Sequence, residues 1–302
     1  MTDHRGTTAP TAGVEVVIDT HVHFWERNLV SHPWLTADLG VLYADYVPAD
    51  LESLLASTPI GGVVVVQSAN SDEEDRYLQR LAIDNDWILG VVGWLGLEDP
   101  VRCAHDAERA VHLVGIRHLS HTEADPDWLV RDQVIESLHH VAEAGLVFEV
   151  PAEYPLHIAH VATIADEVPT LRIVIDHLGK PPLGTDQMTE WERLIRDVAA
   201  RPNVHAKVSG LNTMAPTPWS ADDLRPAIDV ALDSFGPERL LFGSDWPVCL
   251  ANGDHAGVVQ NTIRCLDALN PDERRHVLHD NAMRLYGIEP VPATSGATGE
   301  HR

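Results

Sequence analysis

The chain has 302 residues, of which 44% are hydrophobic, so it can bury a sizeable core and does not have the composition of a disordered protein. Its 21 lysines and arginines stand against 46 aspartates and glutamates, a formal charge of −25 that disfavours nucleic acid and anionic lipid as partners. Three cysteines at wide spacing argue against a disulfide framework and fit a reducing compartment.

The N-terminal thirteen residues contain no apolar segment of the kind that a signal peptide needs. No stretch of the chain reaches the ~20 apolar residues that span a bilayer. The sequence therefore predicts a cytoplasmic protein that has no membrane partner. We expect residues 1–13 and 291–302 to be disordered tails on a single domain that covers residues 14–290.

Short apolar runs alternate with longer amphipathic segments, the pattern of parallel strands joined by crossover helices. Eight runs predict strands, in the order VEVVIDTHV, GVVVVQS, ILGVVGWL, VGIRHL, LVFEVPA, RIVIDHLG, VHAKVSGL and RLLFGSDWP. Helix signals stand between them: Pro48 opens one segment, the acidic run SDEED begins another, and Gly145 ends a third. Eight such pairs, with no break in composition, predict a (β/α)₈ TIM barrel. No GxGxxG or P-loop motif supports nucleotide binding.

Ionisable side chains gather at the ends of these strands, where barrels of this type carry their active sites. His21 and His23 end the first strand two residues apart, so they share one face of an extended segment. His177 follows the sixth strand and Asp245 the eighth. Such groups are expensive on apolar strands unless they are paired or ligated, so the set indicates a site. Asp176 precedes His177, and we expect it to face the opposite side in a structural role.

Three of these segments, IDTHVHFW, IVIDHLGKP and LLFGSDWPV, resemble the amidohydrolase superfamily and its amidohydrolase-2 branch. GVVVVQSANSDEEDRYL, GVVGWLGLEDP, GIRH and KVSGL are similar to the L-fuconolactonase-like and L-rhamnonolactonase-like enzymes of that branch. The similarity runs from Val16 to about Ile288. It implies an amidohydrolase-like distorted barrel and a hydrolase that opens a small-molecule lactone, with the lactone of a sugar acid as the expected substrate.

The resemblance also implies roles for four residues. His21 and His23 match the metal pair of the first strand, His177 the histidine of the sixth strand, and Asp245 the aspartate of the eighth. We expect Asp245 to act as the general base. The substrate is expected to be polarised either by one divalent metal, Zn or Mn, held by the same four residues, or, without metal, by hydrogen bonds from the three histidines.

The fourth and fifth strands depart from the superfamily pattern. Arg117 and His118 stand where a carboxylated lysine or a glutamate is common, and the fifth strand carries Glu149 in place of a histidine. Metal-free catalysis therefore stays open beside the mononuclear site, with Glu149 as a candidate extra ligand. The fork of Arg117 suits a substrate carboxylate or a developing oxyanion, and Lys207 is a weaker candidate for the same task.

Loop residues are expected to set the substrate preference. Trp34, Trp94 and Trp246 predict an aromatic wall for the C–H face of a sugar ring, or else belong to the core. Gln67 and Asn70 follow the second strand and are candidates to bind substrate hydroxyls or to cap the next helix. The expected partner is a small molecule, and a homo-oligomeric state stays open.

Two alternatives use the same residues. A metal-dependent decarboxylase of an unsaturated or aromatic acid would need the same histidines and aspartate, but it typically adds a metal-binding histidine on the fifth strand. A catalytically silent binding barrel would have lost at least one of the four residues, and all four are present. No GxSxG motif supports a serine nucleophile.

Overall fold

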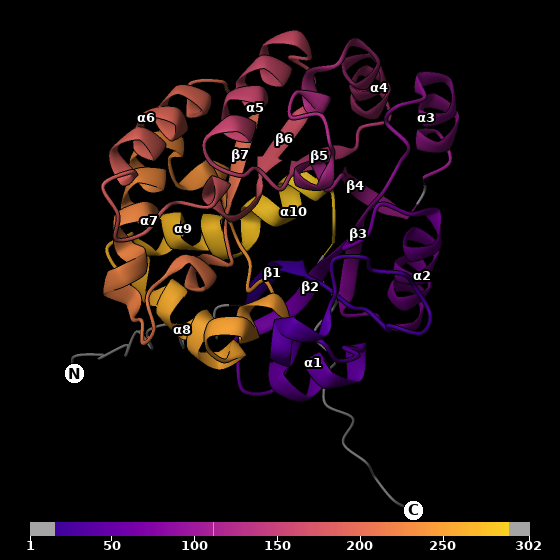
Figure 1. Ribbon diagram of the computed structural model, residues 1–302. Coiled ribbons are helices and arrows are strands. Elements are labelled where there is room, and N and C mark those ends of the chain that lie inside the picture. Colours follow the sequence, from indigo (N-terminus) through magenta and orange to yellow (C-terminus); the bar gives the residue numbers. More distant parts are fainter. Residues whose placement is uncertain (1–15, 111, 290–302) are drawn as a thin grey trace, which may run out of the picture.

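The computed structural model describes residues 16–110 and 112–289, so the two predicted tails lie outside the described residues. Eight parallel strands follow one another in chain order around a barrel, with helices on the outside (Figure 1). They are β1 (Val17–Val22), β2 (Ile60–Val66), β3 (Ile88–Gly93), β4 (Leu113–Arg117), β5 (Val147–Val150), β6 (Arg172–Ile175), β7 (Val204–Val208) and β8 (Leu240–Phe242). The predicted TIM barrel and its eight strands are confirmed.

Helices alternate with the strands and cover the barrel. They are α1 (Pro48–Leu55), α2 (Asp72–Asp84), α3 (Pro100–Ala107), α4 (Asp132–Glu143), α5 (Leu156–Glu167), α6 (Met188–Ala199), α7 (Ala221–Phe235), α8 (His255–Cys265), α9 (Pro271–Arg275) and α10 (Asn281–Tyr286). Local sequence explains several starts: Ser71 caps α2 by accepting from the Glu74 N–H, and Pro100 opens α3 behind the Asp99 cap. Within the described ranges no helix is long and apolar enough to cross a membrane.

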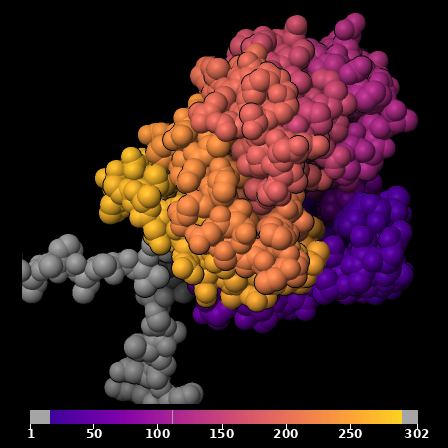
Figure 2. Space-filling view, turned by 60° about the vertical axis from the view of Figure 1, so that its left-hand side comes forward, coloured from indigo at the N-terminus to yellow at the C-terminus, as the bar shows by residue number. Residues whose placement is uncertain are grey.

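The barrel closes where the first and last strands meet. The His23 N–H donates to the Trp246 carbonyl at 2.7 Å, and the Asp245 N–H donates to the His21 carbonyl at 2.9 Å. Figure 2 shows the indigo N-terminal part and the orange-yellow C-terminal part of the described chain side by side on one face, as this closure requires. Residues from opposite ends of the sequence therefore share one edge of the barrel.

The interior of the barrel has an apolar half and a polar half. Ile18, Val64, Val174 and Leu241 form one buried cluster with Tyr286 and its neighbours on α10, which crosses the barrel in Figure 1. The other end of the interior holds the ionisable side chains that follow the strands. The apolar cluster thus supports the polar side chains from below.

The long connection between β1 and α1 has its own small core. Trp25 and Tyr46 exchange two backbone hydrogen bonds of 3.0 and 2.8 Å, and Trp25 packs with Leu35 and Trp34. The indole N–H of Trp34 donates to the Ser68 carbonyl at 2.7 Å, which fastens the connection to the end of β2. This connection is therefore an ordered wall beside the barrel mouth.

Candidate active site

His21 and His23 direct their Nε2 atoms toward each other at a separation of 3.1 Å. The predicted common face is thus confirmed by the geometry. Nδ1 of His23 lies 2.7 Å from the Val66 carbonyl, which can only accept, so Nδ1 carries the proton and Nε2 keeps its lone pair. A backbone carbonyl that fixes a histidine tautomer in this way is typical of metal-binding histidines.

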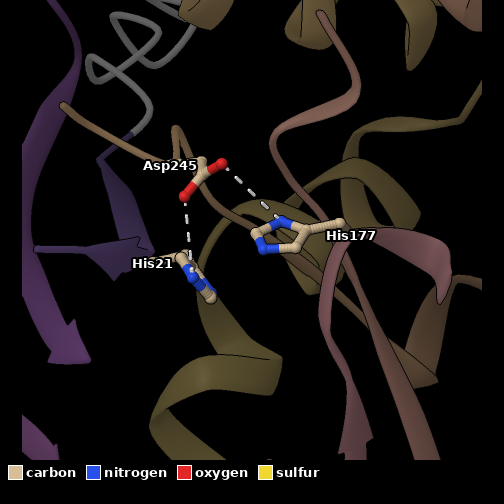
Figure 3. A group of neighbouring side chains, drawn as sticks. All are labelled: His21, His177 and Asp245. Atoms are coloured by element: carbon tan, nitrogen blue, oxygen red, sulfur yellow. Dashed lines mark ion pairs between the residues drawn. The ribbon is translucent and has the colours of Figure 1, made fainter. Parts of the chain in front are cut away.

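Asp245 stands beside His21 and His177 (Figure 3), and His23 also lies next to it. Its Oδ1 lies 3.4 Å from His23 Nε2 and 3.7 Å from His21 Nε2, and its Oδ2 lies 4.0 Å from His177 Nδ1. Burial alone would raise the pKa of Asp245, but the neighbouring histidines, His177 first, outweigh it and lower the pKa to about 2. Asp245 is therefore a carboxylate at neutral pH.

The donor atoms fit a divalent metal. His21 Nε2, His23 Nε2 and Asp245 Oδ1 form a triangle with sides of 3.1, 3.4 and 3.7 Å. Tetrahedral zinc with bonds near 2.0–2.1 Å spaces its ligands about 3.3 Å apart, close to these sides. His21, His177 and Asp245 form a buried group that could hold a metal ion, and a second such group joins His21 to Glu149 and Asp176.

The opposite edge of the His21 ring contacts a cation and an anion. Nδ1 lies 3.2 Å from Lys207 Nζ and 3.4 Å from Asp176 Oδ1. Burial lowers the pKa of His21 well below its ordinary value, although Asp176 acts in the other direction. The ring is therefore neutral, the form that binds metal.

Asp176 lies inside this cluster, so its predicted outward orientation is wrong. It accepts a hydrogen bond of 2.9 Å from Arg117 Nη1 and is fully buried. The alternation of side chains that we assumed ends with β6 at Ile175, and the following turn has a different backbone conformation. Asp176 thus ties His21 and Arg117 together beneath the site.

Lys207 and Glu149 also lie below the site. Both are fully buried, and Lys207 Nζ donates to Glu149 Oε2 at 2.6 Å, while the Tyr286 hydroxyl donates to Glu149 Oε1. The prediction that Lys207 contacts the substrate is corrected for this reason. Burial raises the pKa of Glu149 to about 7, with Lys207 opposing the shift. Glu149 belongs to the second buried acidic group, away from Asp245.

The turn after β6 is left-handed. His177, Leu178 and Lys180 have φ values of 54°, 51° and 54°, and Gly179 between them has φ 70°. Each non-glycine residue in this region costs about 1–2 kcal/mol, so the surrounding packing must hold the turn. Leu178 is fully buried, and its carbonyl accepts a 2.9 Å hydrogen bond from the Trp191 indole. The turn brings His177 and Lys180 to the same cavity.

Gly179 provides a test of this turn. A Cβ at Gly179 would lie 2.6 Å from Ile158 Cδ1, so Gly179→Ala should destabilise the fold by about 1–3 kcal/mol in urea denaturation. The matched control is Gly184→Ala, at a glycine with a similar φ of 74° but no atom within 4 Å of its Cβ. Equal losses in the two variants would mean that contact with Ile158 does not hold the turn.

A cavity of about 260 Å³ opens above these groups. Ligand pockets commonly measure about 300–1,000 Å³, so this cavity suits a small ligand. His23, Arg117, His177 and Asp245 contribute to its lining, each from the C-terminal end of a different strand. The cavity therefore lies where the fold predicts an active site.

Arg117 is the buried cation of the cavity, with 4% of its surface exposed. Its Nη1 lies 3.2 Å from His21 Nε2 as well as near Asp176, and its Nη2 donates to the Gln67 carbonyl. These contacts hold the guanidinium in place at the cavity, and its binding of a substrate carboxylate or oxyanion stays a prediction.

The aromatic lining of the cavity differs from the prediction. Trp34 lines it, and so does Trp25, which the sequence analysis did not single out. Trp94 lies elsewhere, with its indole N–H 3.1 Å from His118 Nδ1, and Trp246 is a core residue with 1% exposure. The aromatic wall is corrected to Trp34, with the fully buried Trp25 behind it, and both belong to the ordered connection after β1.

Gln67 and Asn70 join two strands and do not line the cavity. The Gln67 amide donates to the Arg117 carbonyl at 2.8 Å, and Asn70 Oδ1 accepts from the Leu119 N–H at 2.8 Å. The helix cap is Ser71, not Asn70. Both predicted roles are corrected: these amides hold the ends of β2 and β4 together.

Lys180, which was not among the predicted site residues, also lines the cavity. A signal was available, because Lys180 and Lys207 are the only lysines in the chain, and the other 19 basic residues are arginine. One of the two lysines lies over the cavity and the other lies beneath the site. An uneven use of lysine was therefore informative about the site.

Comparison with known proteins agrees with this geometry. The amidohydrolase family model (Amidohydro_2) matches residues 18–288. An L-fucono-1,5-lactonase of Burkholderia ambifaria is 36% identical over 279 residues, which cover 90% of this chain and 96% of the relative. A crystal structure of a Burkholderia multivorans amidohydrolase with bound zinc is 32% identical, with a TM-score of 0.84 over 91% of this chain and 100% of the other. The chain therefore belongs to the amidohydrolase family, and it is a hydrolase of that family.

Proposed function

We propose that this hydrolase opens the lactone ring of a sugar acid by attack of water on the lactone carbonyl. The observation that carries the proposal is an ionised aspartate, Asp245, beside His21, His23 and His177 at the base of a small cavity. Similarity to L-fucono-1,5-lactonases supports the lactone as the substrate class.

Asp245 would act as the general base. Its carboxylate takes a proton from the attacking water while the water oxygen bonds to the carbonyl carbon. The ring C–O bond then breaks, and Asp245 returns the proton to the departing ring oxygen, which leaves as the free hydroxyl of the product. The carboxylate thus starts and ends the reaction ionised.

Arg117 and His177 would stabilise the carbonyl oxygen as it gains negative charge. Both line the cavity, and both are held before substrate arrives: Arg117 by Asp176 at 2.9 Å and His177 by the Ser209 hydroxyl at 3.0 Å from Nδ1. Donors that are already oriented stabilise developing charge with little reorganisation, and this is often the largest contribution to catalysis.

His21, His23 and Asp245, whose donor atoms lie 3.1–3.7 Å apart, would hold a divalent metal, and His177 forms a metal-capable group with His21 and Asp245. Such a metal, when bound, polarises a carbonyl and lowers the pKa of bound water to about 7. With or without a bound metal, the roles of the side chains are the same: Asp245 moves the proton, and Arg117 faces the carbonyl oxygen.

The test is a pH-indicator assay of the purified protein against a panel of aldonolactones, with aryl esters and amides as controls. We expect acid release from at least one aldonolactone and none from the amides. Absence of acid release from every lactone by the folded protein would contradict the proposal, and release of CO₂ from aromatic acids would favour a decarboxylase.

Metal dependence is tested by dialysis against a chelator and titration with Zn²⁺. We expect calorimetry to detect one Zn²⁺ per chain, and His23→Asn to lose this binding because His23 Nε2 is a donor that Val66 keeps unprotonated. Hydrolysis that falls with chelator and returns with Zn²⁺ would assign the metal a catalytic part. An unchanged rate would assign the chemistry to the side chains alone.

A further inference from the structure

We infer that Lys180 and Glu153 form a hydroxyl-binding pair that selects uncharged, polyhydroxylated lactones. This inference rests on the proposed function and names the substrate class of the same cavity. It concerns two residues that take no part in the chemistry described above.

Lys180 and Glu153 form an accessible ion pair at the cavity. Lys180 lines the cavity from the left-handed turn after β6, and its Nζ lies 2.7 Å from Oε1 of Glu153, which follows β5. The side chains are 36% and 46% exposed, and Glu153, which is not part of the cavity lining, is joined to the cavity through Lys180. An ammonium has three N–H donors and a carboxylate only accepts, so the pair can donate to one hydroxyl and accept from another.

The two walls of the cavity have different chemistry. Trp34, with the fully buried Trp25 behind it, reaches it from the connection after β1, while Lys180 reaches it from the end of β6. In a ring of eight strands in chain order, β5 and β6 lie across the barrel from β1 and β2. A sugar lactone also has two sides, with C–H groups that suit indole faces and hydroxyls that suit a charged pair.

The charges of the cavity favour a neutral substrate. Among the described residues that line it, Arg117 and Lys180 are the cations apart from histidine, and each has a carboxylate partner, Asp176 and Glu153 respectively. In the metal-free protein the negative charge of Asp245 is then left over, so a lactone that carries its own carboxylate would meet repulsion from Asp245 and no unpaired cation.

The choice of lysine supports a role in binding. Nineteen of the 21 basic residues are arginine, yet Lys180 stands at the cavity. The lysine ammonium donates one N–H to Glu153 and has two N–H groups left for substrate hydroxyls. An arginine guanidinium would instead bind the Glu153 carboxylate with two parallel N–H groups of its planar fork.

The main test compares two lactones of the same ring size on Lys180→Met. The first is an aldono-1,5-lactone that the wild type hydrolyses, and the second is δ-valerolactone, which has no hydroxyls. We expect kcat/KM for the aldonolactone to fall roughly 10- to 100-fold, mostly through KM, and kcat/KM for δ-valerolactone to change less than about threefold. The control is Arg193→Met, which removes an exposed cation paired with Glu190 on α6, outside the cavity.

The outcomes separate this inference from the proposed function. Equal losses on the two lactones, or none on either, would overturn the role of Lys180 while hydrolysis by the wild type stands. A wild type that hydrolyses no aldonolactone of the panel would instead contradict the proposed function. Glu153→Gln should raise kcat/KM for a lactone that bears a carboxylate relative to the aldonolactone, and an unchanged ratio would overturn the charge argument.

A measurement on the wild type avoids any dependence on the folding of variants. Acetylation of Lys180 by an N-hydroxysuccinimide ester, followed by mass spectrometry, should slow at least about threefold when a saturating aldonate occupies the cavity. Lys207 is fully buried and should stay unmodified in both samples as an internal control. Equal labelling of Lys180 with and without the aldonate would overturn the inference.

Discussion

Asp245→Asn should lose roughly 10²- to 10⁴-fold in kcat on any lactone that the wild type hydrolyses, while the barrel stays folded. The amide has the shape of the carboxylate, but it cannot take a proton from water and carries no charge. The fold should tolerate the change because the neighbours of Asp245 are His21, His23 and His177, and the pKa values of His21 and His177 are lowered by burial. Steady-state kinetics and circular dichroism measure the two effects.

Asp75→Asn is the matched control for this variant. Asp75 is also a largely buried carboxylate, which accepts from the Gln79 amide at 2.6 Å, but it does not line the active-site cavity. It should keep wild-type kcat. If Asp245→Asn retained more than a tenth of the wild-type kcat, Asp245 would not be the general base.

Lys207→Met should destabilise the protein by about 3–5 kcal/mol, the largest stability effect that we expect from a single substitution. The variant leaves Glu149 and Asp176 in the barrel interior without the ammonium that lies 2.6 and 3.6 Å from their carboxylate oxygens. The free energy of unfolding, measured in urea at pH 8, tests this. Adding Glu149→Gln to Lys207→Met should recover part of the loss, because it removes one of the unpaired charges.

The loss should depend on pH. Burial already raises the folded-state pKa of Glu149 to about 7, above its value in the unfolded chain, so the folded state gains relative stability as pH falls and Glu149 takes up a proton. Without Lys207 this pKa rises further. The destabilisation by Lys207→Met should therefore be smaller at pH 5 than at pH 8. Equal losses at the two pH values would show that Glu149 is not the charge that matters.

The strands and the central residues could be predicted from the sequence because the signals are local. Runs such as GVVVVQS are apolar at almost every position, as strands covered on both faces must be. His21 and His23 followed from the two-residue repeat of an extended strand. Asp245 and His177 followed from their places after strands, since the barrel brings all strand ends to one edge.

The cavity lining could not be predicted in the same way, because it depends on backbone beyond the strand ends. Asp176 points inward because a left-handed turn follows it, and no periodic sequence pattern predicts such a turn. Trp34 lines the cavity while Trp94 and Trp246 do not, and this difference depends on how the loops that carry them fold. The bond between Tyr286 and Glu149 joins residues 137 positions apart, so neither predicts the other.

The hydrogen bond between Tyr286 and Glu149 has a consequence for folding during synthesis on the ribosome. Tyr286 lies near the end of the described chain, and its hydroxyl holds the carboxylate that in turn holds Lys207 against His21. Domains generally begin to fold while the chain is still being made. Here the strands can assemble early, but the cluster beneath His21 gains its last partner only after α10 has been translated. Catalytic competence should therefore arrive only once α10 is available, and nascent chains arrested before α10 should hold a barrel that does not yet work.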